Sequence, residues 1–299
     1  MSVTVKGYAK INLHLDVIGI REDGYHSVET VMQSLSLCDD VTVTALQDKV
    51  FVSTCNVEGV PTDEKNIAVR AARLFFERAC KNGGARISIE KRIPMAAGLA
   101  GGSADAAATL IALNTAFDHP LSDADLCEIG AMLGADVPFC IMCGTYYSDG
   151  RGDMLHSFPT LNNDLIFVVA CGGEGVSTPW GYKLLDSTFD NFLGYIPKGT
   201  ELLRKAVENG DKYDFCEHIF NIFEEPVLKQ RPTATHISSV LKNCGALCSM
   251  MSGSGPSVFA VYKDANKAAV AAEKLRLEGY FATVATPIGK RTQDVVVND

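Results

Sequence analysis

The sequence contains no apolar run that approaches the roughly 18 residues of a membrane-spanning helix. Its first residues, MSVTVKGYAK, lack the apolar stretch of a secretory signal. Internal repeats and low-complexity tracts are missing as well. We therefore expect neither a membrane span nor an export signal, and the expected location is the cytoplasm.

Positive charge is also scarce. The chain has 27 Lys and Arg residues against 36 Asp and Glu residues, which gives a formal net charge of −9 and a pI near 5.2. A surface this acidic argues against general binding to nucleic acids or anionic membranes. Any anionic ligand must therefore be met by a local group of Lys, Arg or backbone N–H groups.

A recognisable zinc pattern is absent too. The 10 cysteines are scattered, and only Cys140 and Cys143 have C-x-x-C spacing, with no second Cys or His pair at zinc spacing. Because this pair lies in a short apolar stretch, residues 137–143, buried small side chains are favoured over a metal or redox role. Free buried thiols suit a reducing cytosol.

The residues that are present describe an ordinary globular protein. The chain has 299 residues, of which 47% are hydrophobic and 21% charged, and this length favours two domains. Glycines at 150 and 152 and a polar run at 160–164 predict the boundary, so we divide the chain into residues 1–158 and 159–299.

Periodicity predicts a mixture of strands and helices. Residues 3–17 alternate with a period of two, which predicts strand with a break near Gly7 and places Lys10, Asn12 and His14 on one face. Further strands are predicted at 28–36, 40–45, 50–54, 85–90, from 137 to 149, at 165–171, within 246–262 and at 280–286. Helices are predicted at 66–80, 103–117, 122–133, 178–187, 200–209, 213–223, 233–243 and up to 279. This order indicates two α+β domains.

The most informative segment is PMAAGLAGGSADAAA, residues 94–108. Three glycines lead to Ser103, a preferred helix N-cap, and a helical pattern follows. Unpaired N–H groups and about half a positive charge at a helix N-terminus favour an anion such as phosphate. The segment is neither a Walker A loop nor a dinucleotide fingerprint, and alone it is equally consistent with a plain connecting turn.

Three segments resemble the motifs of the GHMP kinases, in order along the chain. They are AKINLHLDVIG (residues 9–19), PMAAGLAGGSADAA (94–107) and MSGSGPSVFAVY (251–262). Two more, DGYHSVET (23–30) and LGADVPFC (133–140), resemble one branch of that family. The resemblance implies an α+β architecture with an N-terminal ribosomal-protein-S5-like domain that binds ATP and a C-terminal ferredoxin-like domain.

The resemblance also implies a reaction. It is ATP-dependent transfer of a phosphoryl group, with Mg²⁺, to the 2-hydroxyl of a cytidine diphosphate sugar alcohol in the non-mevalonate route to isoprenoid precursors. Lys10 and Asp136 fall on the family's catalytic positions. A nearby ammonium keeps a carboxylate ionised and stabilises a hydroxyl oxygen that gains charge. From the residues alone, a helix cap or Asx turn at Asp136 and a solvated strand face at Lys10 remain open.

The same resemblance assigns the two substrates. Tyr25 and His26 fall where the family holds cytosine, although a packed Tyr and a surface His are the alternative without that context. Alternation places Asn12 beside Lys10. Thr178 falls near the transferred phosphate and Tyr182 where a second aromatic meets the cytidine. For ATP the matching residues are Asn66, Ile67, Lys91, Pro94, Gly98, Leu99, Gly101, Gly102 and Ser103, with residues 251–255 as a second turn that closes over the site.

The sequence departs from the family pattern at Tyr8, where a proline is common, at residues 150–153, and at two residues near the expected phosphate site. Ala100 replaces an expected glycine and would be strained if that position needs a positive φ. Asp105 would repel a triphosphate unless it faces away or shares Mg²⁺. The alternatives are a homoserine or mevalonate kinase of the same family and a nucleotide-binding regulator without chemistry. We expect a small-molecule substrate, no nucleic-acid or membrane partner, and a monomer or weak homodimer; the residues do not indicate the metal ligands.

Overall fold

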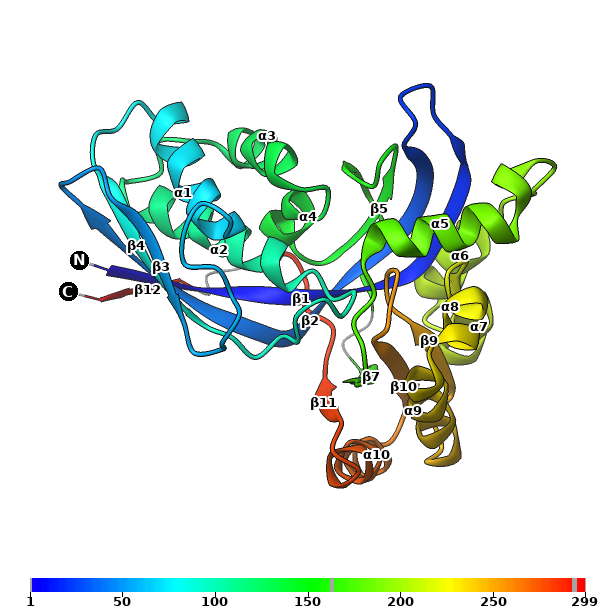
Figure 1. The fold of residues 1–299 in the computed structure, drawn as a ribbon. Coiled ribbons are helices and arrows are strands. Elements are labelled where there is room, and N and C mark those ends of the chain that lie inside the picture. Colours follow the sequence, from blue (N-terminus) through cyan, green and yellow to red (C-terminus); the bar gives the residue numbers. More distant parts are fainter. Residues whose placement is uncertain (1, 162–163, 292–294, 299) are drawn as a thin grey trace.

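The computed structural model describes residues 2–161, 164–291 and 295–298. Its helices and strands follow one another as shown in Figure 1. In chain order they are β1 (Ser2–Ile20), β2 (His26–Leu46), β3 (Phe51–Cys55), α1 (Ile67–Arg78), β4 (Gly84–Glu90), α2 (Gly101–Ala116), α3 (Asp123–Leu133), α4 (Val137–Met142), β5 (Thr145–Asp149), β6 (Met154–Ser157), β7 (Ile166–Cys171), α5 (Thr178–Thr188), η1 (Asp190–Phe192), α6 (Glu201–Asn209), α7 (Lys212–His218), β8 (Phe220–Asn221), α8 (Glu224–Gln230), α9 (Pro232–Asn243), β9 (Cys248–Met251), β10 (Val258–Tyr262), α10 (Ala265–Leu277), β11 (Phe281–Ala285) and β12 (Val295–Asn298).

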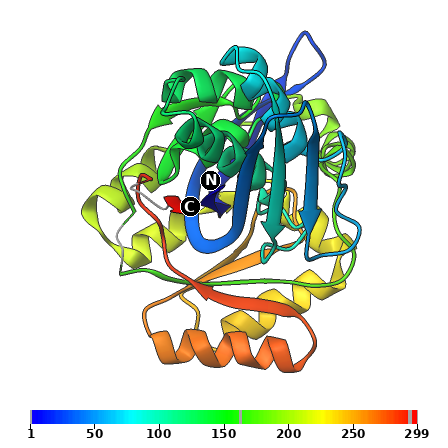
Figure 2. The same cartoon turned by 90° about the vertical axis from the view of Figure 1, so that its left-hand side faces the viewer.

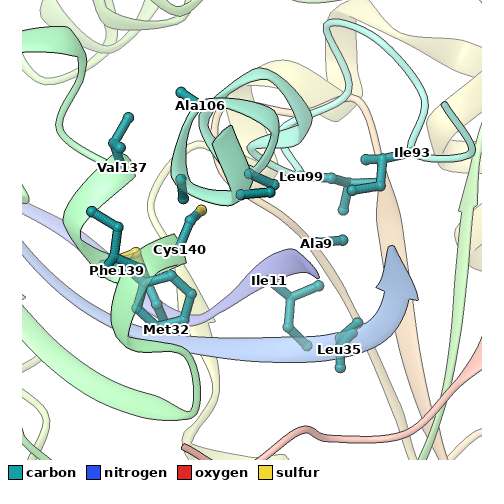
Figure 3. Close-up of a cluster of buried hydrophobic side chains, with 14 of the residues drawn as sticks. Ala9, Ile11, Met32, Leu35, Ile93, Leu99, Ala106, Val137, Phe139 and Cys140 are labelled. Atoms are coloured by element: carbon teal, nitrogen blue, oxygen red, sulfur yellow. The ribbon is translucent and has the colours of Figure 1, made fainter. Parts of the chain in front are cut away.

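The first sheet is built around the long antiparallel pair β1 and β2. Within the described residues it has eight strands, in the order β12-β1-β2-β4-β3, with β5 on β2, β6 on β5 and β8 parallel to β1. Helices α1 to α4 lie together on one side of this pair (Figure 1). Figure 3 shows apolar side chains of both strands gathered with those of the glycine loop, α2 and α4, and this cluster forms the main core.

The second sheet is antiparallel, with four strands among the described residues in the order β11-β7-β10-β9. Helices α9 and α10 pack on it and bury a separate apolar cluster that includes Ile237, Leu241 and Leu275 (Figures 1 and 2). The architecture is α+β, as predicted. Strands β8 and β12 come from the second half of the chain but join the first sheet. The division at 158/159 stays a prediction, and residues 162–163 of the polar run lie outside the described residues.

The expected break at Gly7 is wrong, because β1 continues through it. A Cβ atom at Gly7 would lie 2.7 Å from the carbonyl oxygen of Ala104 in α2. The glycine therefore lets the helix approach the strand closely. A β-bulge follows between Tyr8 and Lys10, where the Lys10 N–H bonds the Leu99 carbonyl oxygen at 3.1 Å. The glycine loop is thereby attached to β1.

Several predicted elements have different bounds. Residues 28–36 and 40–45 belong to one strand, β2, which continues through buried Asp39. The Asp39 carboxylate accepts hydrogen bonds from the N–H groups of Arg92 and Ile93, just after β4. The predicted strand from 137 begins instead as helix α4, with Pro138 in its first turn, where proline is favoured. A short apolar run does not distinguish the two structures. The helix predicted at 213–223 ends at His218, and β8 and α8 follow.

The two predicted serine caps have opposite outcomes. Ser122 caps α3 in a capping box with Asp125, as predicted. The prediction that Ser103 caps α2 is wrong, because α2 begins at Gly101 and its N-cap residue is Ala100.

Cys140 and Cys143 are buried in the core, and burial raises the pKa of the Cys140 thiol well above its usual range. Cys216 and Cys248 form a disulfide that the sequence did not predict. Among the described residues, no helix combines the length and apolar character that a membrane span requires.

Candidate active site

A cavity of about 570 Å³ lies where β1, β2, the glycine loop and the starts of α1, α2, α4 and α5 converge. Most of the residues predicted for the site line it. They are Lys10, Asn12, Asn66, Ile67, Lys91, Pro94, Gly98, Leu99, Gly101, Gly102, Ser103, Asp136, Thr178 and Tyr182. Segments more than 200 residues apart in sequence meet here, because Gly253 and Ser254 line the same space.

The glycine loop owes its shape to left-handed backbone at Ala96 (φ 50°), Gly98 (φ 75°) and Ala100 (φ 56°). The strain expected at Ala100 is therefore present, at about 1–2 kcal/mol for a residue with a Cβ atom. The loop leads directly into α2, whose first N–H groups have no partner inside the helix. Backbone donors and a helix N-terminus thus meet at one wall of the cavity, an arrangement that favours an anion.

A second glycine turn packs against this loop. A Cβ atom at Gly253 would lie 3.1 Å from the Gly98 carbonyl oxygen and 3.5 Å from Lys10 Nζ. The Ser252 hydroxyl donates to the Gly98 carbonyl oxygen at 3.0 Å. Asn221 Nδ2 holds the turn from behind, since it donates to the carbonyl oxygens of Met251 (2.7 Å) and Gly253 (2.9 Å). Nothing in the sequence singles out Asn221, which lies about 30 residues before the turn that it supports.

Lys10 is buried at the centre of the cavity wall. Its ammonium donates to Asn12 Oδ1 at 2.6 Å, and both side chains are at most 4% exposed. Lys10 and Asn12 therefore share one environment, as alternation along β1 predicts. The alternative of a solvated strand face is wrong for Lys10, because the glycine loop and the second turn cover it.

Asp136 stands at the N-cap position of α4, but its side chain makes no capping hydrogen bond. It lines the same cavity as Lys10. No ion pair joins the two within the part of the chain that the structure describes. Burial and the negative charge of Asp136 raise the pKa of Tyr182 to about 12, which places that tyrosine in the field of the carboxylate. The helix-cap alternative does not account for Asp136, which makes no cap hydrogen bond and lines the cavity.

Lys91 lines the cavity and forms two buried ion pairs. Its ammonium lies 2.5 Å from Asp39 Oδ2 and 2.8 Å from Asp105 Oδ2, and all three groups are buried. Burial lowers the pKa of Lys91, but the charges of Asp105 and Asp39 outweigh it and leave that pKa raised. Burial raises the pKa of Asp105 to about 7, against the pull of Lys91. The departure at Asp105 is explained, because the Lys91 ammonium compensates its charge.

The aromatic residues lie at the other end of the site. The His26 ring stacks on Tyr182, with centroids 4.3 Å apart, and His26 Nε2 lies 2.7 Å from Asp186 Oδ1. Tyr25 is 59% exposed, and the guanidinium of Arg151 lies 5.5 Å from its ring centroid. Tyr25 and His26 do not line the cavity themselves. They adjoin it through Arg151 and Tyr182, which do.

Basic side chains outnumber acidic ones in the cavity lining, although the protein as a whole is acidic. The lining carries four basic side chains, Lys10, Lys65, Lys91 and Arg151, and two acidic ones, Asp105 and Asp136. Lys65 and Arg151 were not predicted, although a basic residue within a glycine turn was a usable signal for Arg151. No group of three or more His, Cys, Asp or Glu side chains suited to a metal ion occurs among the described residues.

Comparisons with known proteins agree with this geometry. Two family models match, "GHMP kinases N terminal domain" over residues 66–144 and "GHMP kinases C terminal" over residues 203–280. The 4-diphosphocytidyl-2-C-methyl-D-erythritol kinase of Caldicellulosiruptor bescii is 40% identical over 278 residues, which cover 91% of this chain and 94% of that one. The enzyme of the same name from Acetivibrio thermocellus is 42% identical over 275 residues, with 92% and 95% covered.

Solved structures show the same relationship. A crystal structure of 4-(cytidine 5'-diphospho)-2C-methyl-D-erythritol kinase has a TM-score of 0.78 and 31% identity, and covers 96% of this chain and 99% of its own. Homoserine kinase from Cytophaga hutchinsonii shares the fold, with a TM-score of 0.74, 17% identity and 99% and 96% covered. Because the first relatives match over nearly their whole length, the chain belongs to the GHMP kinase family, among the 4-diphosphocytidyl-2-C-methyl-D-erythritol kinases.

Proposed function

We propose that this protein transfers the γ-phosphoryl group of ATP to the 2-hydroxyl of 4-diphosphocytidyl-2-C-methyl-D-erythritol. The observation that carries the proposal is one cavity whose lining contains the glycine loop, Lys10 and Asp136, has more basic than acidic side chains, and is flanked by stacked aromatic rings. A triphosphate donor and a diphosphate acceptor suit this excess of basic side chains. The names of the relatives support the acceptor.

Phosphoryl transfer asks the protein mainly for positioning and charge. In the proposal, the N–H groups from Gly98 to Ser103 and the N-terminus of α2 bind the triphosphate. Asn66 and Ile67 border the adenine, and Pro94 and Leu99 hold the loop. Lys91 acts from the cavity floor, where its ion pairs with Asp39 and Asp105 fix its ammonium beside the loop.

Asp136 and Lys10 act on the acceptor hydroxyl. The Asp136 carboxylate accepts a hydrogen bond from the hydroxyl and orients its oxygen toward the γ-phosphorus. It takes the proton as the new P–O bond forms and the bond to the ADP oxygen breaks. The Lys10 ammonium lies on the same cavity wall and stabilises the negative charge that develops on the transferred group.

Mg²⁺ belongs to the proposal as a companion of ATP. Ser103 lines the cavity, and its hydroxyl oxygen fits such an ion, because Mg²⁺ is commonly held by few protein oxygens together with phosphates and water. Ser103, at the start of α2, would hold it. When bound, the ion would neutralise charge on the phosphates.

The aromatic end of the site would select the cytidine. Tyr25 and Tyr182 offer rings for stacking on cytosine, and His26 offers a hydrogen-bonding edge. Arg151 lies beside Tyr25 and lines the cavity, so that its guanidinium is placed for the diphosphate of the acceptor. Thr178 would contact the transferred phosphate from the first turn of α5.

A comparison of acceptors tests the substrate. Turnover with ATP is measured with 4-diphosphocytidyl-2-C-methyl-D-erythritol, mevalonate and homoserine at equal concentrations. The cytidine compound should be used with a kcat/KM orders of magnitude above the other two. A preference for mevalonate or homoserine would refute the proposed acceptor, and no turnover with any of them would favour a nucleotide-binding regulator.

The role of Asp136 is tested by Asp136→Asn, which keeps the shape of the side chain but removes the base. We expect kcat to fall about 100- to 10,000-fold, while the affinity for ATP stays within a factor of two or so. Asp123→Asn, at an exposed position in α3, serves as the control for the loss of one carboxylate. Unchanged turnover in a folded Asp136→Asn variant would remove Asp136 from the mechanism.

We further propose that the protein works in the cytoplasm as a monomer or weak homodimer. Its net charge of −9 gives no general attraction to nucleic acids or anionic membranes, which supports a role with small-molecule partners alone. Sedimentation of the purified protein at several concentrations measures its oligomeric state. A stable tetramer would contradict this part of the proposal.

A further inference from the structure

Lys10 is held by a relay of buried hydrogen bonds that reaches the second strand. Lys10 Nζ donates to Asn12 Oδ1 at 2.6 Å, and Asn12 Nδ2 donates to Thr30 Oγ1 at 2.8 Å. The Thr30 hydroxyl donates in turn to the His14 carbonyl oxygen at 2.7 Å. Lys10, Asn12 and Thr30 are each at most 4% exposed, so these hydrogen bonds are largely shielded from bulk water.

The direction of the relay is fixed by chemistry. A backbone carbonyl oxygen can only accept a hydrogen bond, so Thr30 donates its single hydroxyl proton to the His14 carbonyl oxygen. Thr30 Oγ1 then accepts from its other neighbour, which obliges Asn12 to present its NH₂ group. The amide oxygen of Asn12 must therefore face Lys10, whose ammonium only donates. If the amide turned over, its NH₂ group would face the ammonium, and both contacts would fail.

The register of β1 and β2 explains why the Thr30 hydroxyl can bond both Asn12 and the backbone of β1. Asn12 pairs with Met32, and an unbroken antiparallel ladder would pair His14 with Thr30. Instead His14 pairs with Val31 and Leu15 with Thr30, because β1 has a bulge between Asn12 and His14. A bulge re-aims side chains locally and is frequent beside active sites. Here it accompanies a Thr30 hydroxyl bonded to both Asn12 and the backbone of β1.

We infer that Thr30 is a positioning residue for phosphoryl transfer, which orients the Lys10 ammonium through the Asn12 amide. This inference rests on the proposed function, because it assigns Lys10 to the reacting phosphate. Thr30 lines the cavity at this point. Its effect is predicted to pass through Asn12 rather than through binding of ATP.

Kinetics of three variants test the inference. Thr30→Val keeps the shape of the side chain but removes the acceptor, and kcat should fall roughly 10- to 100-fold with little change in the KM for ATP. Thr30→Ser keeps the hydroxyl and should restore most of kcat. Thr109→Val removes an equally buried hydroxyl, which bonds only the Asp105 carbonyl oxygen in α2, and should leave kcat nearly unchanged.

A double-variant comparison separates a relay from a general packing effect. In an Asn12→Ala background the relay is already cut, so adding Thr30→Val should lower kcat no further. An equal loss in both backgrounds would show that Thr30 acts independently of Asn12 and would overturn the inference. So would a Thr30→Val enzyme with full kcat, or a Thr30→Ser enzyme as impaired as Thr30→Val.

A measurement on the free protein keeps this test distinct from the proposed function. In ¹⁵N-edited NMR spectra, the Asn12 side-chain NH₂ protons should exchange slowly with water in the parent protein and in Thr30→Ser. They should exchange much faster in Thr30→Val, while the dispersion of the backbone amide signals shows that this variant is folded. Because no acceptor is present, this result stands even if the acceptor proves to be another compound. Fast exchange in the parent protein would refute the relay.

Discussion

The two ends of the cavity are built in different ways. At the phosphoryl-transfer end Lys10, Asn12 and Thr30 are almost fully buried, and backbone contacts between two glycine turns hold the wall in place. At the aromatic end Tyr25 is 59% exposed and contacts Arg151 through its ring. One end is fixed by close packing and directed hydrogen bonds, whereas the other presents surfaces that a ligand can complete.

This difference follows from what each end must recognise. A developing charge is stabilised by groups already in place, because reorganisation during the reaction would cost free energy. A nucleobase is bound by stacking, which tolerates small shifts of the ring. Changes at the buried end should therefore reduce stability and turnover together. Changes at the aromatic end should reduce only the affinity for the acceptor.

The sharpest test of the buried end is Gly98→Ala. Gly98 has a φ of 75°, and a Cβ atom there would lie 2.3 Å from the Ser252 carbonyl oxygen. The added methyl group must push the two glycine turns apart, so we expect a loss of about 2–5 kcal/mol in unfolding free energy. Turnover should fall with it. Chemical denaturation and steady-state kinetics measure both effects.

Gly102→Ala is the matched control in the same loop. The nearest atom to a Cβ there is Ile67 Cγ2 at 3.6 Å, an ordinary contact, and the residue lies in the first turn of α2. Alanine in a helix should stabilise the fold by up to about 1 kcal/mol, while the methyl group should raise the KM for ATP if the nucleotide lies against this turn. Equal stability of the two variants would contradict the close packing claimed for Gly98.

Short motifs made the buried end largely predictable. The alternation of β1 placed Lys10 and Asn12 together, and the glycine-rich segment predicted a loop that leads into a helix. These features depend on residue types with strong local preferences. Local preference also identified Ser122 as a cap, because its partner Asp125 lies three residues away.

The residues that the sequence did not reveal act through tertiary geometry. Thr30 has its role because of a bulge in the facing strand, and Asn221 because of a turn about 30 residues downstream. Neither residue type is unusual where it stands. Lys91 was predicted only as a basic residue near ATP, since its partners Asp39 and Asp105 lie 52 and 14 positions away. The helix α4 was missed because its apolar run is too short to show a period.

A second test of the buried end uses pH. His14 follows Asn12 on β1, is 1% exposed and has no hydrogen-bond partner for either ring nitrogen among the described residues. Burial lowers its pKa from 6.5 to about 4, so the folded protein keeps the ring neutral. Below pH 6.5 the His14 ring binds a proton in the unfolded chain but stays unprotonated in the folded protein. Stability is therefore full above pH 6.5 and is lost as the pH falls toward 4.

The His14→Leu variant should lack this loss. Between about pH 8 and pH 4 the unfolding free energy of the parent protein should fall by about 3 kcal/mol more than that of His14→Leu. Denaturation curves at several pH values measure the two slopes. The exposed His156 gives the control, and His156→Gln should follow the parent protein. Parallel curves for His14→Leu and the parent would mean that the ring is hydrated or charged when folded.

The smallest change in stability is expected at the aromatic end, from Tyr25→Ala. Because the side chain is 59% exposed, its removal should alter the unfolding free energy by less than about 0.5 kcal/mol. Loss of a stacked ring should nevertheless weaken acceptor binding by about 1–3 kcal/mol, or roughly 5- to 150-fold in KM. The KM for ATP should stay unchanged, since the glycine loop is left intact.

Tyr213→Ala is the control for Tyr25→Ala, because the two tyrosines are equally exposed but lie at different places on the protein. Tyr213 is 58% exposed and lies on α7, where its ring contacts Lys263 and does not line the cavity. Its removal should leave both KM values unchanged, so a rise in the KM for the acceptor that is confined to Tyr25→Ala would localise base recognition to the β1–β2 turn. If Tyr25→Ala raised the KM for ATP and for the acceptor equally, the two ends of the cavity would not bind the two substrates independently. The aromatic end would then be part of the same packed unit as the glycine loop.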